Sequence, residues 1–275
     1  MTTGCATIFA PLSVPACSGA RLWFLAADRN ERGGPATPMP PPGHLLADAL
    51  RCEDRALCCG TRSMTRHKTQ TRLGIISDVH GDVAALQDAL VQLARLHVSE
   101  IVCAGDLLDW GPSPGRCIDL LQESQIPCVR GNHDFVDIGG GTLDPPTFLS
   151  GKALAFLDAM PSSWDRAIAG VRVVVAHASP GDIMRGIHLD RAPDVGAILQ
   201  TAAADVLVVG HTHVPMHLAA PQGAIVNPGS ILRQPPRTER IPASGTFGIL
   251  ELPSRRFSVH RASDGVELTP TGNAS

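Results

Sequence analysis

The stretch "DVLVVGHTH", residues 205–213, joins an apolar run to two histidines that alternate with a threonine. The four residues 206–209 suit a buried strand, because β-branched and other apolar residues dominate such runs. Gly210 follows at once, and His211 and His213 then leave the end of the strand. Alternating histidines at such a place can occupy neighbouring positions around metal ions. The stretch therefore predicts a strand that delivers metal ligands.

The same arrangement recurs at four earlier places in the chain. The runs and the residues that follow them are "LGIIS" (73–77) with Asp78 and His80, "EIVCAG" (100–105) with Asp106, "IPCVRG" (126–131) with Asn132 and His133, and "VRVVVA" (171–176) with His177. Each motif alone has an ordinary alternative, since Asp-x-His often caps a helix and a single buried histidine is often just hydrogen-bonded. Five of them at the same place relative to a strand favour a shared metal site.

The segments between these strands predict α/β architecture. Apolar residues recur at intervals of three and four from Val83 to Leu93, which indicates an amphipathic helix, and a second helix is expected at 115–124. "RAIAG" (166–170) should form a hairpin with 171–176, and later strands are expected at 223–230, 247–252 and 256–261. Because the carboxyl ends of strands in open α/β sheets face one crevice, ligands far apart in sequence can converge there.

Composition limits the classes of function. A chain of 275 residues with 44% hydrophobic and 18% charged residues can bury the core of one enzyme-sized domain. A net charge of −3, with no block of Lys and Arg, argues against stable binding of nucleic acid. No apolar run reaches the roughly eighteen residues of a membrane span. The eight cysteines include no C-x-x-C pair, so we expect reduced thiols and a cytoplasmic location.

The chain changes character near residue 70. Residues 1–70 include the Pro- and Gly-rich stretch "ERGGPATPMPPPG" (31–43), and we expect them to be a low-complexity, disordered extension ahead of a domain at 71–275. Met64 stands where the domain could start, so we expect 1–63 to be dispensable or untranslated.

Taken in order, "DVHGD", "GDLLDWGP", "GNHD", "AHASP", "GHTH" and "NPGS" resemble the motifs of the calcineurin-like metallophosphoesterase superfamily, in its small bacterial and archaeal phosphodiesterase-type branch. The resemblance covers about residues 71–262. It implies an α/β fold, namely a four-layer αββα sandwich of two mixed β-sheets flanked by helices. It also implies a dinuclear metal site at the strand ends.

The resemblance further implies a ligand set for each ion. One ion would be held by Asp78, His80, Asp106 and His213, and the other by Asp106, Asn132, His177 and His211, with Asp106 bridging. Imidazole, carboxylate and amide ligands without a thiolate suit Mn²⁺ best, with Fe, Zn, Ni or Co as alternatives.

The activity implied by the resemblance is hydrolysis of phosphodiester bonds, or alternatively phosphomonoester bonds, in small nucleotide-like substrates through attack by a metal-bound hydroxide. His133 would be the general acid, and Asp109 would orient it. Asn132, His133, Trp110 and Arg237 would contact the substrate. Trp110 stands where related protein phosphatases carry an arginine, so its ring could stack on a base or pack under the loop.

Other functions stay open. The chain could hydrolyse dinucleoside polyphosphates or phosphomonoesters, or it could be a non-catalytic scaffold on the same fold. His133 and every ligand position are kept, which favours an enzyme. We expect a small phosphoester as the partner, and assembly into a homo-oligomer is an open alternative.

Overall fold

The computed structural model describes residues 70–135, 149–233 and 245–270 of the chain. Three predictions lie outside these residues: the disordered extension, of which only Gln70 is described, the start at Met64, and the substrate contact by Arg237.

Five strands form the first sheet, in the order β10-β9-β8-β1-β2. They are β1 (Thr71–Ile76), β2 (Glu100–Cys103), β8 (Thr246–Leu252), β9 (Arg256–Arg261) and β10 (Glu267–Leu268). β1 and β2 are parallel, with Ile75 opposite Val102, whereas β8 runs antiparallel to β1. The first sheet is therefore mixed, as expected.

Five more strands form the second sheet, in the order β3-β4-β5-β7-β6. They are β3 (Ser163–Ile168), β4 (Val171–Ala176), β5 (Val206–Val208), β6 (Met216–Ala220) and β7 (Gly223–Asn227). β3 and β4 form the antiparallel hairpin that the sequence predicts. β4, β5 and β7 run parallel, so β4 and β5 send their carboxyl ends in one direction.

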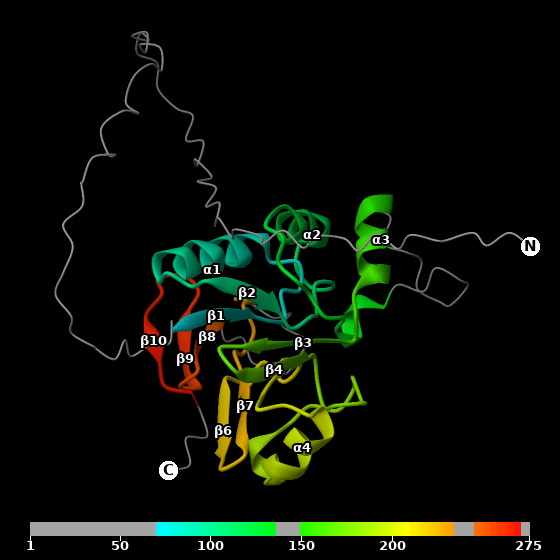
Figure 1. Ribbon diagram of the computed structural model, residues 1–275. Helices are drawn as coiled ribbons and strands as arrows, with labels where there is room; N and C mark the ends of the chain where they lie inside the picture. The colour runs from blue at the N-terminus through cyan, green and yellow to red at the C-terminus, as the bar shows by residue number, and fades with distance from the viewer. Residues whose placement is uncertain (1–69, 136–148, 234–244, 271–275) are drawn as a thin grey trace, which may run out of the picture. The chain divides into compact units, whose positions relative to one another are not determined.

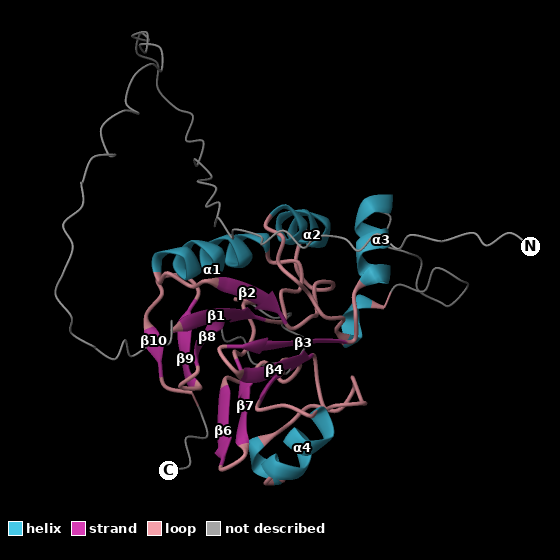
Figure 2. Ribbon diagram, in the orientation of Figure 1, coloured by secondary structure: helices cyan, strands magenta, loops and turns pink. Residues whose placement is uncertain are grey.

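Helices cover the outer faces of both sheets (Figures 1 and 2). They are α1 (Val83–Arg95), α2 (Pro114–Glu123), α3 (Gly151–Ala159) and α4 (Val195–Ala202). Successive strand residues face opposite sides of a sheet. In β1, Ile75 lies in the buried cluster between the two sheets, and Ile76 lies in the cluster that includes residues of α1, α2 and α3. A third cluster joins α4 to the second sheet. The predicted αββα order of layers is confirmed.

Local sequence explains where the first helices begin. The Asp82 carboxylate accepts a hydrogen bond from the Ala85 amide at 2.9 Å and so caps α1. Pro114 stands in the first turn of α2, where its missing N–H needs no partner. A bilayer-spanning helix needs about 20 apolar residues, and the described part of the chain has no helix of that length and character.

The strand predicted at 126–131 is not formed. In this segment only Cys128 makes an isolated parallel bridge, to Cys103 at the end of β2. Pro127 accepts a hydrogen bond from Cys103 but has no N–H to extend a ladder, and the Arg130 amide donates to Pro161 instead. The segment still runs beside β2 and brings the following "GNHD" motif to the same end of the sheet.

Candidate metal centre

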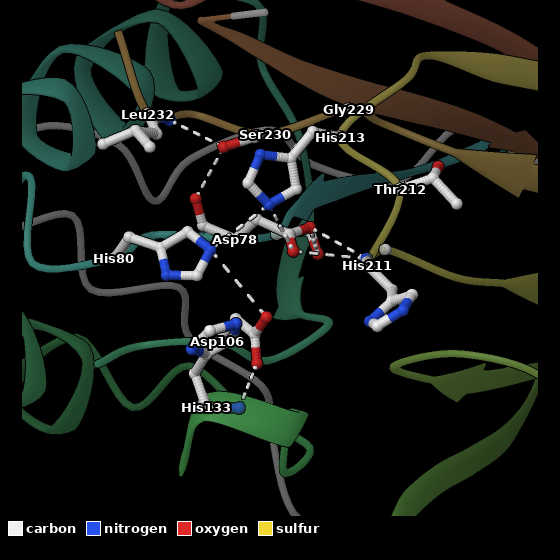
Figure 3. Close-up of polar contacts among 12 residues, drawn as sticks. Asp78, His80, Asp106, His133, His211, Thr212, His213, Gly229, Ser230 and Leu232 are labelled. Carbon is white, nitrogen blue, oxygen red and sulfur yellow. Dashed lines mark hydrogen bonds and ion pairs between the residues drawn. The ribbon is translucent and has the colours of Figure 1, made fainter. Parts of the chain in front are cut away.

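The predicted ligands meet at the carboxyl ends of the strands. Five of them can be seen in Figure 3, namely Asp78, His80, Asp106, His211 and His213. The chain segments after β1 supply Asp78 and His80, those after β2 and β4 supply Asp106 and His177, and the one after β5 supplies His211 and His213. They form two groups, and within each the ligand atoms lie within 4.8 Å of one another. We call Asp78, His80 and His213 the first group, and Asp106, His177 and His211 the second group.

The first group is fully buried. Its members are at most 2% exposed. Nε2 of His213 lies 3.2 Å from Oδ1 of Asp78 and 3.2 Å from Nε2 of His80. Nδ1 of His213 is buried and has no hydrogen-bond partner among the described residues. An imidazole ring placed in this way is held by what its Nε2 contacts.

Asn132, the remaining ligand that the resemblance implies, lies against the second group. Oδ2 of Asp106 lies 3.1 Å from Nε2 of His177. Oδ1 of Asn132 lies 3.0 Å from the same nitrogen and 2.7 Å from Nδ1 of His211. The two imidazole nitrogens are themselves 3.3 Å apart. Asn132 thus adds a neutral oxygen to a cluster of one carboxylate and two imidazoles.

Asp106 joins the two groups. Its Oδ2 lies 3.1 Å from His177 of the second group and 3.8 Å from Nε2 of His80 in the first. Burial alone would raise the pKa of this carboxyl, yet the hydrogen bond and charge of His177 hold it below its usual range. Asp106 is therefore ionised and placed to serve both groups.

Backbone carbonyls fix the tautomers of two ligands. Nδ1 of His80 donates to the Leu108 carbonyl at 2.8 Å, and Nδ1 of His177 donates to the Ala104 carbonyl at 2.8 Å. A neutral imidazole whose Nδ1 carries the proton presents a lone pair at Nε2, and this partner pattern is typical of metal-ligating histidines. In both residues Nε2 is the atom that faces the group. The donor set therefore fits divalent metal ions.

The pKa values of two of these histidines shift in opposite directions. Burial lowers the pKa of His80, which favours its neutral form. Burial would also lower the pKa of His177, but the hydrogen bond to Asp106 outweighs it and raises this pKa to about 9. A metal ion that binds His177 beside Asp106 has to displace the extra proton of the imidazole, because only the neutral ring is a ligand.

His133 lies beside the groups without joining either. Its Nδ1 is 2.5 Å from Oδ2 of Asp109, and its backbone amide donates to Oδ1 of Asp106 at 2.9 Å. The hydrogen bond to Asp109 raises the pKa of His133, although partial burial opposes this. The structure thus brings the predicted acid and its predicted partner together at the edge of the site.

Trp110 packs on the histidines of the site. Its ring centroid is 4.0 Å from that of His80, with a tilt of 32°, and 5.1 Å from that of His133 in an edge-to-face arrangement. The ring is half-buried. Trp110 therefore forms a wall beside the first group.

Strained backbone aims the ligands. Five of the six residues in the two groups have positive φ, namely Asp78 (52°), His80 (44°), Asp106 (57°), His211 (67°) and His213 (58°). Outside glycine, aspartate and histidine are among the residues that adopt this left-handed conformation most readily. Such strain persists where the surrounding structure fixes it, and it concentrates at functional sites.

Asp134 is a residue whose importance the sequence only hinted at. Its buried carboxylate accepts hydrogen bonds from the amides of Asp106, Leu107 and Gly131, at 2.7 to 2.9 Å. Burial, together with the charge of Asp106, raises its pKa to about 6. A side chain on Gly131 would clash with Asp106, which explains the glycine. Asp134 thus fixes the loop that carries Asp106.

Comparison with known proteins places these features in a family. A sequence profile described as "Calcineurin-like phosphoesterase superfamily domain" matches residues 71–254. The uncharacterized protein MJ0912 of Methanocaldococcus jannaschii is 26% identical over 191 residues, which cover 59% of this chain and 76% of that protein.

Two solved structures share the fold. A metallophosphoesterase from Sphaerobacter thermophilus has a TM-score of 0.55 and 25% identity, covering 70% of this chain and 87% of that one. The hypothetical protein PH1004 from Pyrococcus horikoshii has a TM-score of 0.56 and 17% identity, covering 73% of this chain and 88% of that one. Because the matched segment runs from β1 to the turn before β9 and includes every candidate ligand, the chain belongs to the calcineurin-like phosphoesterase superfamily.

Proposed function

We propose that the chain is a dinuclear-metal-dependent phosphoesterase that hydrolyses phosphodiester bonds in small nucleotide-like molecules, with phosphomonoesters as the alternative substrate class. One observation carries the proposal: a single carboxylate oxygen of Asp106 lies within 4 Å of an imidazole nitrogen from each ligand group. Two cations that share a ligand in this way can clamp both the attacking and the leaving oxygen of a phosphoryl group.

The first ion would be held by Asp78, His80, His213 and Asp106, and the second by Asp106, Asn132, His177 and His211. When bound, two divalent cations, for which we propose Mn²⁺, supply Lewis acidity, an activated water and positive charge at this place. The two carboxylates offset only part of that charge, and Asn132 adds none. The residues therefore leave the centre positive enough to attract an anionic phosphoryl group.

His133 is proposed as the general acid. Its hydrogen bond to Asp109 occupies Nδ1 and leaves Nε2 to carry the proton that the departing oxygen needs. The hydrogen bond to Asp109 raises the pKa of His133, which favours the protonated ring that a general acid needs. Asp109 orients the ring and stabilises its charge.

Trp110 is proposed to line the substrate site on the side of the first group. One face of its ring lies against His80, so a substrate base would meet the rest of the indole. Arg233 is an unsuitable phosphate ligand, because its guanidinium already pairs with two carboxylates. It lies 3.2 Å from Asp88 in α1 and 3.7 Å from Asp82, which caps that helix.

The proposal is tested with the full-length chain stripped of metal by a chelator. Turnover is measured on a bis-aryl phosphate, a mono-aryl phosphate and a dinucleoside polyphosphate, with Mn²⁺, Co²⁺, Ni²⁺ or Zn²⁺ added in turn. We expect fastest turnover of the bis-aryl phosphate with Mn²⁺. Faster turnover of either other substrate would reassign the substrate class. Two bound ions without any turnover would indicate a non-catalytic scaffold.

A further inference from the structure

A short turn after β7 contacts Asp78 and the segment that carries His211 and His213. It comprises residues 227–232, from the last residue of β7 onward, and we call it the inter-sheet turn. Its Ile231 amide donates to the Ser77 carbonyl at 3.1 Å, and its Ser230 carbonyl accepts from the Thr246 amide of β8 at 2.8 Å. The inter-sheet turn thus begins in the second sheet and is hydrogen-bonded to the first.

Asn227 holds the segment that carries two ligands. Its Nδ2 donates to the Gly210 carbonyl at 2.7 Å and to Oγ1 of Thr212 at 3.1 Å. Its Oδ1 accepts from the Gly229 amide at 2.8 Å, which fixes the orientation of the carboxamide. Gly210 and Thr212 flank His211, and His213 follows. One fully buried side chain therefore contacts the residues on both sides of His211, through the backbone of Gly210 and the side chain of Thr212.

Ser230 holds Asp78 in a similar way, and the contacts can be followed in Figure 3. Oγ of Ser230 donates to the Asp78 carbonyl at 2.8 Å and accepts from the Leu232 amide at 3.0 Å. The Asp78 amide donates to the Gly105 carbonyl at 2.9 Å. Asp78 has a φ of 52°, in the left-handed region, and hydrogen bonds on both of its backbone groups help to hold that conformation.

We propose that Asn227 and Ser230 are positioning residues that set the two ligand groups differently. Ser230 acts on Asp78, which is a member of the first group. Asn227 acts on the segment with His211, a member of the second group, and His213, a member of the first. The inference rests on the proposed metal site and extends it to the residues that hold the ligands in place.

The size of the effect follows from the kind of contact. Partners that orient metal ligands typically change metal affinity by about 10–100-fold when they are removed. Ser230→Ala removes a hydroxyl and leaves the buried Asp78 carbonyl without that donor. Asn227→Asp keeps the shape and the acceptor for Gly229 but removes both donated hydrogen bonds. We expect Ser230→Ala to lower the affinity of the chain for one ion, and Asn227→Asp to lower its affinity for both.

A matched control separates positioning from stability. Ser258 in β9 is also buried, and its hydroxyl donates to Nε2 of His260 at 2.9 Å. Ser258→Ala therefore removes a buried serine hydroxyl, as Ser230→Ala does, at a residue that contacts no ligand. Thr212→Val serves as a milder second variant, because it removes one of the two hydrogen bonds donated by Asn227 and leaves the other.

The experiment is titration of each metal-free, full-length variant with Co²⁺ alone. The visible absorption of bound Co²⁺ depends on its ligands and geometry and reports occupancy and coordination at both places. Thermal unfolding without metal reports stability. We expect two ions in the wild-type chain and in Ser258→Ala. In Ser230→Ala the affinity for one Co²⁺ ion should fall about 10–100-fold, and in Asn227→Asp the affinity for both ions should fall by this amount. Thr212→Val should show a smaller loss of affinity.

Wild-type affinity and spectra in Ser230→Ala, Asn227→Asp and Thr212→Val would overturn the inference and leave the proposed function standing. So would equal weakening in Ser258→Ala, because the effect would then be one of general stability. If the wild-type chain bound no Co²⁺, the proposed function would fail together with the inference.

Discussion

The two ligand groups use similar side chains, yet the first is closed to solvent and the second is open on one side. Asp78, His80 and His213 are at most 2% exposed, and Trp110 covers His80. In the second group His211 is only half-buried. Buried ligands cannot be replaced by water, whereas a half-exposed ligand can. We therefore expect a firmly held ion in the first group and a more exchangeable ion, nearer to the substrate, in the second.

The largest effect is expected from a change at Asp106, the residue that both ligand groups share. Asp106→Asn keeps the size and the left-handed backbone but loses the bridging charge. We expect turnover to fall by more than about 10⁴-fold, beyond the usual contribution of a general acid, and bound metal to fall below two ions per chain. Activity assays and elemental analysis measure both. Retention of two ions would show that Asp106 does not bridge.

The next change removes chemistry while leaving both groups whole. His133→Ala should lower turnover by about 10²–10⁴-fold, with metal content unchanged, because His133 contacts the groups mainly through its backbone amide. Asp109→Asn is the companion variant and should cause a smaller loss. Unchanged turnover in His133→Ala would mean that another group protonates the leaving oxygen.

A direct comparison of the two groups comes from paired histidine variants. His213→Ala should weaken binding of the first ion by more than about 100-fold, because loss of a direct ligand should exceed the 10–100-fold typical of an outer partner. It also removes one of the partners of the buried Asp78 carboxylate. His211→Ala should cost less, since water can take the place of a half-exposed ring. Metal titration of both variants gives the order, and the opposite order would refute the closed and open assignment.

The smallest effect is expected at the wall of the first group. Aromatic pairs contribute about 0.5–1.5 kcal/mol beyond the free energy of burying their area. Trp110→Ala should therefore change the affinity for the first ion and the KM for substrate by about tenfold at most. It should also let a chelator extract the first ion faster. Trp110→Phe keeps a ring against His80 and should restore slow extraction. Equal extraction rates in all three proteins would show that Trp110 does not close this group.

Much of the site could be predicted from sequence because strand and ligand follow one another along the chain. "LGIIS" before Asp78 and "DVLVVG" before His211 each predict a buried strand and what its carboxyl end presents. The αββα layers came from resemblance rather than from pattern. Alternation alone does not reveal that β8 returns beside β1, a pairing between residues about 180 positions apart.

The rest depends on contacts that have no signature in the residue order. The segment 126–131 looks like a strand, and Pro127 limits it to one bridge. Trp110 could have stacked on a substrate or packed under its loop, and only the distance to His80 shows that one face is covered. The hydrogen bonds of Asn227 and Ser230 join segments up to 152 positions apart.

The left-handed backbone of Asp78, His80, Asp106, His211 and His213 has a consequence for protein engineering. These side chains converge because the main chain takes the left-handed conformation at each of them. Copying the same amino acids onto the strand ends of another host fold would leave them pointing elsewhere. A successful transplant would have to carry the connecting loops, with their anchoring amides and carbonyls, as one unit.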